Sequence, residues 1–289
     1  MNKTGIYYAY WEQSWSADYV KYVKKVKSLG FDILEIAAGC LPDMPHESLT
    51  ELKNTALNEG VELTCCIGLP SQYDVSSADE KVRSAGMEFM CKIFDAMNVL
   101  DSKLLGGIIY SSWPGTVSSC EEKAHAEKRS ADSLKELAKY AKGCGITCCL
   151  EIVNRFEQYM MNTAKEGADF LDNVAEDNVK LLLDTFHMNI EEDNIGRAIK
   201  TAGSKLGHFH IGECNRKPPG KGHMPWDEIA DALRDINYTG AVVMEPFLKP
   251  GGEVGRDIRV FRDLSGGADE AEMDNMAKEA LEFIKSKLR

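Results

Sequence analysis

Four side chains that could bind a metal ion lie near the ends of four short apolar segments in the second half of the chain. They are Glu151, Asp184, His210 and Glu245. A strand buried on both faces has little reason to carry charge unless a site requires it. The segments are too short for helices and are typical of buried parallel strands. They read TCCLEIV from Thr147, VKLLLDTF from Val179, LGHFHIG from Leu206 and GAVVMEPF from Gly240.

The ligand types indicate which metal such a site would prefer. Three carboxylates and one imidazole form a mostly oxygen site, which favours Mn²⁺, Mg²⁺ or Co²⁺ over the thiolate-rich surroundings of structural zinc. One such residue alone would more simply be a capping or ion-pair residue at a strand end. Four successive strands that each supply a ligand type favour a metal site.

The whole chain alternates between short apolar segments and helical patterns. Since neighbouring parallel strands require crossover connections, eight such alternations predict a single-domain α/β fold, a (β/α)8 TIM barrel over residues 1–289. Active sites of these barrels lie at the C-terminal ends of the strands, where the four candidate ligands are expected. The four earlier strands are predicted at GIYYAY from Gly5, DILEIAA from Asp32, VELTCCIG from Val61 and KLLGGIIY from Lys103. Helices are predicted over residues 16–29, 48–60, 79–100, 127–145, 163–175, 194–203, 227–240 and 269–288.

The amino-acid composition of the chain argues against some classes of binding partner. The net charge is −12, and we find no clusters of Lys and Arg of the kind that nucleic acids and anionic membrane surfaces recruit. No segment approaches the ~20 apolar residues that cross a bilayer, and the N-terminus enters a strand without a signal segment. We therefore expect neither a nucleic-acid nor a membrane partner, and a cytoplasmic location.

The nine cysteines agree with a reducing compartment. Cys65 and Cys66 are adjacent in a predicted strand, so they point to opposite faces and are poorly placed to pair. A zinc site of Cys144 with Cys148 and Cys149 lacks a second cysteine pair or a histidine at finger-like spacing. Buried free thiols are the favoured interpretation.

Two of the candidate ligands are glutamates from strands that lie apart around the barrel. Glu151 and Glu245 could therefore face a bound substrate from different sides. A divalent metal that polarises a ketone and its neighbouring hydroxyl would acidify the carbon between them and stabilise an enediolate. Removal of a proton on one face and its return on the other would invert that carbon.

Long strings of this sequence resemble those of the D-tagatose 3-epimerase and D-allulose (D-psicose) 3-epimerase family, within the wider xylose-isomerase-like barrels. They run over almost the whole chain, and such long strings are far more specific than a four-residue motif. The resemblance rests on GIYYAYW, WEQSW, LGFDILEIAA, LEIVNRFE, LLLDTFHMNIEED, GHFHIGECNRKPPGKGHMPW and GAVVMEPF.

The resemblance implies roles for individual residues. The metal ligands would be Glu151, Asp184, His210 and Glu245, and Glu151 and Glu245 would also exchange the C3 proton. The cofactor would be one Mn²⁺ or Co²⁺ ion per subunit, with Mg²⁺ as a further candidate, and the protein would form a homodimer or homotetramer. The implied substrate contacts are Tyr7, Trp113, Glu157, His187, Arg216 and Phe247, of which His187 and Arg216 would hold the carbonyl end of the sugar.

Without the resemblance, the sequence around each residue gives only partial support for these substrate contacts. His187, expected in the loop after strand six, could equally cap an element or orient a ligand. Arg216 lies in the Pro- and Gly-rich segment NRKPPGKG, where a mobile, solvated cation is usual. Aromatic residues on barrel strands are more often core than pocket wall. The chain also departs from the allulose epimerases in CIGLPSQYD and GGIIYSSWPG, where Ile109 and Ser112 are expected near the distal end of the sugar.

The predicted activity is metal-dependent C3 epimerisation of a free ketose that interconverts D-fructose and D-allulose, with D-tagatose, D-sorbose or a pentulose as further substrates. An aldose–ketose isomerase on the same scaffold is the first alternative. A metal-dependent phosphodiesterase or endonuclease would require more metal ligands and a basic groove, whereas the chain has six histidines and is acidic. A silent sugar-binding barrel would not need both glutamates.

Overall fold

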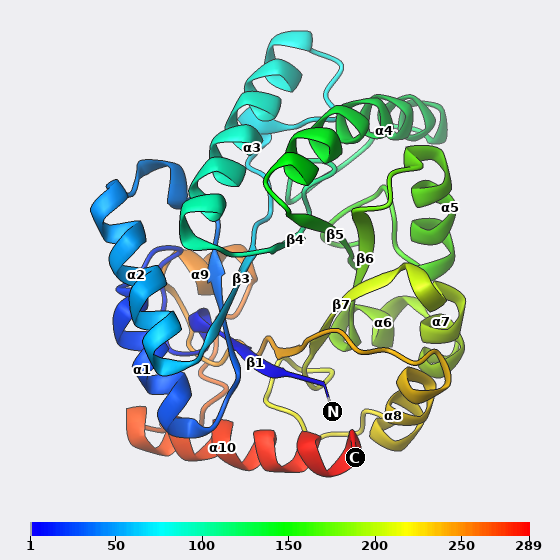
Figure 1. Cartoon of the computed structure of the whole chain (residues 1–289). Coiled ribbons are helices and arrows are strands. Elements are labelled where there is room, and N and C mark those ends of the chain that lie inside the picture. Colours follow the sequence, from blue (N-terminus) through cyan, green and yellow to red (C-terminus); the bar gives the residue numbers. More distant parts are fainter. Residues whose placement is uncertain (1) are drawn as a thin grey trace.

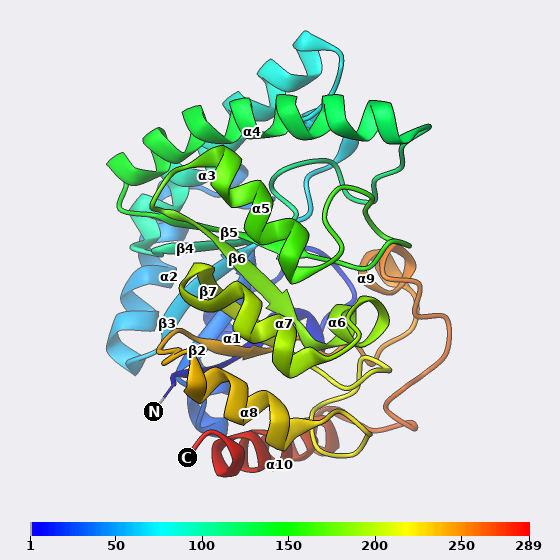
Figure 2. The ribbon, with the colours of Figure 1, turned by 90° about the vertical axis from the view of Figure 1, so that its right-hand side faces the viewer.

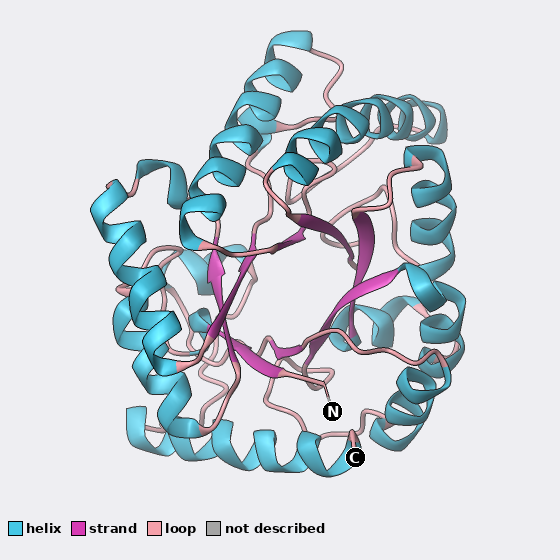
Figure 3. Cartoon of the chain, in the orientation of Figure 1, coloured by secondary structure: helices cyan, strands magenta, loops and turns pink. Residues whose placement is uncertain are grey.

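Eight parallel strands close into a barrel in the computed structural model, which describes residues 2–289. Each strand pairs with its neighbours in sequence, and β1 pairs with β8 to complete the ring seen in Figure 3. The predicted (β/α)8 fold is confirmed, and each of the eight predicted segments overlaps one strand. The strands are β1 (Thr4–Tyr7), β2 (Ile33–Ala37), β3 (Glu62–Cys66), β4 (Leu104–Gly107), β5 (Thr147–Ile152), β6 (Val179–Asp184), β7 (Leu206–Ile211) and β8 (Val242–Met244).

Helices surround the strands and cover their outer faces (Figure 1). Most lie where the sequence predicts them, but α4 begins well before residue 127, because the side chain of Ser119 accepts a hydrogen bond from the backbone N–H of Glu122 and so caps an earlier start. The short helices α6 and α9 were not predicted. The helices are α1 (Tyr19–Leu29), α2 (His46–Glu59), α3 (Glu80–Leu100), α4 (Cys120–Gly143), α5 (Ala164–Val174), α6 (Thr185–Glu191), α7 (Ile195–Ala202), α8 (Trp226–Asp235), α9 (Gly252–Asp257) and α10 (Glu270–Lys287).

The two ends of the barrel differ in character. Figure 2 shows both chain termini at one end, with α6 and α9 at the other, where the strands end. Helix α6 begins directly after β6, because the side chain of Asp184 accepts a hydrogen bond from the backbone N–H of Phe186. The same residue is therefore the last of a strand and the cap of a helix, and it places the following turn at the mouth of the barrel.

The barrel interior is closely packed, as expected for strands buried on both faces. Within the described chain all nine cysteines are unpaired. The four strand cysteines Cys65, Cys66, Cys148 and Cys149 are buried as predicted, but Cys120 is exposed and the other four are only partly buried, so the prediction that most are buried was wrong. Across residues 2–289, no helix combines the length and apolar character needed to span a bilayer.

A close helix contact supports one wall of the mouth. Gly86 of α3 packs against the short 3-10 helix η3 (Ser71–Tyr73), whose three residues line the cavity described below. A methyl group at Gly86 would overlap the backbone carbonyl of Tyr73. The absence of a side chain at this position lets the helix and the rim approach each other.

We therefore expect Gly86→Ala to lower the free energy of unfolding by about 1–3 kcal/mol, because the backbone must shift to admit the methyl group. Chemical denaturation measures the change. Gly143→Ala is the matched control, since Gly143 ends α4 and a methyl group there meets no atom within 4 Å among the described residues. Equal stability of the two variants would contradict the close contact.

Candidate functional site

A cavity of about 920 Å³ opens at the C-terminal ends of the strands. Glu151 and Glu245 lie in its wall. Asp184 and His210 lie deeper, where they are almost completely buried. The lining also includes every residue for which a substrate contact was predicted, namely Tyr7, Trp113, Glu157, His187, Arg216 and Phe247.

The four predicted metal ligands converge from four consecutive strands. Glu151 is in β5, Asp184 ends β6, His210 is in β7 and Glu245 directly follows β8. Nδ1 of His210 lies 3.9 Å from Oε1 of Glu151 and 3.7 Å from Oε1 of Glu245. Single ligand atoms of Glu151, His210 and Glu245 lie within 4.8 Å of one another, and so do those of Glu151, Asp184 and His187. Glu151 therefore links two overlapping sets of candidate ligands.

The hydrogen bonding of His210 suits a metal ligand. Its Nε2 lies 2.6 Å from Oε1 of Glu35, and because an ionised carboxylate can only accept, Nε2 carries the proton of this bond. Nδ1 is buried and has no hydrogen-bond partner among the described residues. A buried ring nitrogen that faces two carboxylates without a partner fits a bound cation. The donor set therefore fits a divalent metal ion.

His187 is arranged in the opposite way. The backbone N–H of Asn154 donates to its Nδ1 over 3.2 Å, so the proton of the neutral ring lies on Nε2. Burial lowers the pKa of His187 to about 4, which keeps the ring neutral near pH 7. Its Nε2 lies 3.8 Å from both Glu151 and Asp184. His187 therefore presents a hydrogen-bond donor to the cavity rather than a free lone pair.

His187 also corrects one expectation about local structure. It lies in the first turn of α6 and not in a loop after the strand. The helix begins at once because Asp184 caps it, and the sequence pattern gave no separate apolar period for so short a helix. A helical turn holds the imidazole more firmly than a loop would.

Buried carboxylates dominate the electrostatics of the site. Burial, and then the charge of Glu245, raise the pKa of Glu151 well above its usual value. Burial also raises the pKa of Glu245, and His210 and Arg216 only partly oppose it, so that the pKa lies at about 7. The pKa of His210 is lowered by burial, but Glu35 and Glu245 more than reverse this and raise it to about 10. The site therefore favours bound protons or a cation.

Arg216 partly neutralises this charge and is not a mobile surface cation. Its Nη1 lies 3.0 Å from both Asp184 and Glu245, and the side chain is buried. The guanidinium also stacks on the ring of Phe186, at 3.9 Å from the centroid. Nη2 lies 3.2 Å from Nε2 of His187, so the guanidinium and the imidazole lie next to each other at the cavity wall. Because the proton of His187 is on Nε2, this contact is not a hydrogen bond.

The loop that carries Arg216 is held by a buried glutamate that the sequence did not single out. The Glu213 carboxylate accepts hydrogen bonds from the backbone N–H of Gly220 at 2.7 Å and from Nε1 of Trp226 at 3.0 Å. Arg216 itself adopts a left-handed conformation, with φ of 64°, and its carbonyl accepts from the N–H of Phe247 at 2.9 Å. These bonds explain why a segment rich in Pro and Gly is ordered around its arginine.

Glu157 lies at the side of the cavity and is kept ionised by its neighbours. Nε1 of Trp113 donates to it over 3.0 Å, and Nδ2 of Asn154 donates over 3.1 Å. Burial would raise the pKa of Glu157, but His187, Arg216 and these two hydrogen bonds outweigh burial and lower it. An ionised carboxylate here could accept hydrogen bonds from substrate hydroxyl groups.

Apolar groups form the rest of the wall. The rings of Tyr7 and Phe247 meet edge to face with centroids 6.1 Å apart, and both line the cavity. One expectation about the wall was wrong. Ile109 is fully buried and does not line the cavity, whereas Ile108 does, and Ser112 is also absent from the lining. The chain leaves the strand at Gly107, where φ is 109°, so the alternation of faces ends there.

The sequence did not single out three further side chains that contact site residues or each other. Glu35 and His208 lie inside the barrel beneath the ligands, and Asn154 orients His187. Glu35 stands in DILEIAA, within a predicted buried strand, so the criterion that singled out Glu151 could have found it. Asn154 carries no comparable signal, because an uncharged amide in a loop is ordinary.

Comparisons with known proteins agree with this geometry. The family model of the xylose isomerase-like TIM barrel matches residues 23–286, so fold and site define a barrel of this class. The D-psicose 3-epimerase of Ruminiclostridium cellulolyticum is 52% identical over 281 residues, which are 97% of this chain and 96% of that protein. The chain belongs to the D-psicose (D-allulose) 3-epimerase family, as the resemblance of its sequence predicted.

Solved structures extend the similarity to three dimensions. The structure of D-psicose 3-epimerase with D-tagatose from Clostridium cellulolyticum H10 has a TM-score of 0.97 and 51% identity and covers 99% of both chains. A structure of D-psicose 3-epimerase in the presence of D-fructose has a TM-score of 0.97 and 49% identity, with the same coverage. Both similarities extend over nearly the entire barrel.

The raised pKa values predict how metal binding should depend on pH. A cation at Nδ1 of His210 displaces a proton from a group with a pKa of about 10, and below about pH 7 Glu245 is protonated as well. Protons therefore compete with the metal, and Mn²⁺ affinity should fall as the pH is lowered through 7, by about tenfold per pH unit for each proton released. Calorimetric titration of chelator-treated protein measures it. An affinity that does not change with pH would contradict the assignment of these ligands.

Proposed function

We propose that this protein is a metal-dependent ketose 3-epimerase that interconverts D-fructose and D-allulose (D-psicose). The observation that carries the proposal is the pair of buried glutamates, Glu151 and Glu245, on either side of the unpartnered Nδ1 of His210. The high identity to a D-psicose 3-epimerase supports the choice of reaction. The cavity also opens toward solvent at the position that barrel enzymes use for catalysis.

Inversion at C3 requires a proton acceptor and a proton donor on opposite faces of the carbon. One glutamate takes the proton as the C3–H bond breaks, and the electron pair moves into the adjoining carbonyl group. The other glutamate delivers a proton to the opposite face, and the electron pair returns to form the new C–H bond. The raised pKa values of Glu151 and Glu245 suit groups that exchange protons near neutral pH.

Negative charge develops on the carbonyl oxygen during this exchange. Arg216 and the Nε2–H of His187 lie next to each other at the cavity wall and would stabilise that charge. A divalent metal ion held by Glu151, Asp184, His210 and Glu245 would supply Lewis-acid polarisation of the ketone when bound.

The remaining wall would hold the sugar and exclude water. Glu157 would accept hydrogen bonds from hydroxyl groups, and Tyr7, Trp113 and Phe247 would contact the C–H face of the ring or chain. The cavity of about 920 Å³ does not select among hexuloses by size, because D-tagatose and D-sorbose are stereoisomers of D-fructose. We include both, together with the smaller pentuloses, as further substrates.

The proposal extends to the cofactor, the assembly and the location. Carboxylate-rich ligation favours Mn²⁺ or Co²⁺, with Mg²⁺ as a further candidate. Exposed aromatic side chains, including Phe156 at 68% and Phe261 at 75%, offer surfaces for a homodimer or homotetramer. The unpaired cysteines suit the cytoplasm.

Metal removal and restoration tests the activity directly. Chelator-treated protein should convert neither D-fructose nor D-tagatose, and addition of Mn²⁺ or Co²⁺ should restore the C3 epimer, which sugar chromatography identifies. An aldose product would show an aldose–ketose isomerase instead. Failure of every metal form on D-fructose, D-tagatose and L-ribulose would leave a sugar-binding or phosphodiesterase function.

Replacement of either glutamate tests the two-carboxylate mechanism. Glu151→Gln and Glu245→Gln should each lower kcat by at least about 10²–10⁴-fold, because an amide cannot exchange the C3 proton. Incorporation of solvent deuterium at C3 should fall in parallel. Glu51→Gln, on the exposed face of α2, is the matched control and should retain full activity. Turnover near the normal rate in either site variant would exclude the mechanism.

A further inference from the structure

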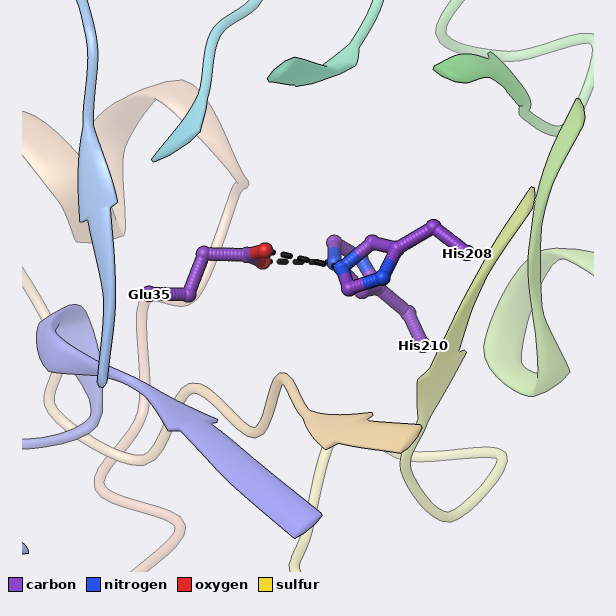
Figure 4. Close-up of side chains that lie close together, drawn as sticks. All are labelled: Glu35, His208 and His210. Carbon is purple, nitrogen blue, oxygen red and sulfur yellow. Dashed lines mark hydrogen bonds and ion pairs between the residues drawn. The ribbon is translucent and has the colours of Figure 1, made fainter. Parts of the chain in front are cut away.

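A buried carboxylate crosses the barrel interior beneath the candidate metal ligands. Glu35 of β2 is fully buried, and Figure 4 shows it pointing across the barrel to His208 and His210 of β7. Its Oε1 lies 2.6 Å from Nε2 of His210. Its Oε2 lies 2.8 Å from Nε2 of His208 and also accepts from the Thr64 hydroxyl at 2.7 Å. Both carboxylate oxygens are therefore engaged.

The three residues could in principle be a second cation site, since their ligand atoms lie within 4.8 Å of one another. The contact distances argue against this. Metal–ligand bonds of roughly 2.0–2.2 Å keep two ligand atoms of one ion about 3 Å or more apart. The contacts of Glu35 with His210 and His208, at 2.6 and 2.8 Å, are shorter and are those of hydrogen bonds. The cluster is therefore a hydrogen-bond network.

The hydrogen-bond network orients His210 toward the candidate metal site. A carboxylate only accepts, so Glu35 keeps the proton of His210 on Nε2 and leaves Nδ1 to face Glu151 and Glu245. The two histidines lie two residues apart in β7, so their side chains project from the same face of the strand. His208 and Thr64 hold the second oxygen of Glu35, and this prevents rotation of the carboxylate away from His210.

We infer that Glu35 is a positioning residue for the metal centre, which it serves by fixing the tautomer and the ring orientation of His210. The inference rests on the proposed function, because it requires that His210 bind a cation through Nδ1. Histidine ligands generally donate their second ring N–H to an acceptor that raises their basicity. Here that acceptor comes from β2, which is three strands away from β7 around the barrel, and reaches His210 across the interior.

The first test measures Mn²⁺ affinity of chelator-treated variants by calorimetry. Glu35→Leu removes the acceptor and should weaken Mn²⁺ binding by about 10–100-fold. Glu35→Gln retains one acceptor oxygen and should recover part of the loss. The control is Asp32→Asn, which alters a carboxylate next to the start of the same strand that accepts from Thr4, away from the site. It should keep the affinity of the unaltered protein.

The second test reads the tautomer in the unaltered protein, so it does not depend on whether a variant folds. Protein with isotope-labelled histidine nitrogens is loaded with diamagnetic Cd²⁺ and examined by NMR. We expect scalar coupling from the metal to Nδ1 of His210 and a slowly exchanging proton on its Nε2. The His210 signals are assigned through backbone correlations in the unaltered protein.

The outcomes separate this inference from the proposed function. Normal Mn²⁺ affinity in a folded Glu35→Leu variant, or metal coupling to Nε2 of His210, would overturn the role of Glu35 while a metal-dependent epimerase remains. Absence of metal binding by the unaltered protein would overturn both.

Discussion

Concentration of negative charge in a buried space is the constraint on which the rest of the site depends. Glu151 and Glu245, in the cavity wall, and the more deeply buried Asp184 lie close together, where little solvent screens them. Such a group is stable only if protons, cations or donors compensate it. Arg216 contributes one fixed positive charge, and Nδ1 of His210, once its proton is displaced, would complete the proposed set of ligands for a divalent ion. The pKa values of Glu151 and Glu245 rise for the same reason, and this makes them suited to proton exchange.

In this barrel, a separate hydrogen-bonding residue holds each of these side chains in place. Glu35 reaches His210 from across the interior, Asn154 directs His187, and Glu213 orders the turn that carries Arg216. Each support is a hydrogen bond to an atom that would otherwise be free to rotate. The two histidines of the site consequently differ: His210 directs Nδ1 toward Glu151 and Glu245, whereas His187 directs an N–H donor toward the cavity. Under the proposed mechanism, a cation and a substrate oxygen would therefore use different histidine nitrogens.

Much of this arrangement could be predicted from local sequence. All eight strands were located, because buried parallel strands leave short apolar runs separated by amphipathic helices. The four candidate ligands were found because a charge late in such a run is costly unless it serves a site. The substrate contacts were weaker predictions. The residues alone left His187 and Arg216 open, and only the family resemblance placed them at the sugar. The helices α6 and α9 were missed because they are too short to show a helical period.

The sequence by itself determined the order of strands and helices, the ligand types available at each strand end and the family to which the chain belongs. Hydrophobic periodicity is a local property of the chain, so these features can be recognised from the sequence alone. Only the tertiary structure decided which atoms face each other. Glu35 and His210 are 175 residues apart in the chain, and their contact exists because closure of the barrel through β8 and β1 brings β2 and β7 to face the same interior. The ring nitrogens that His187 and His210 turn toward the site, and the burial of Arg216, depend on such contacts. Backbone geometry decides that Ile108 and not Ile109 lines the cavity. No local sequence pattern records either.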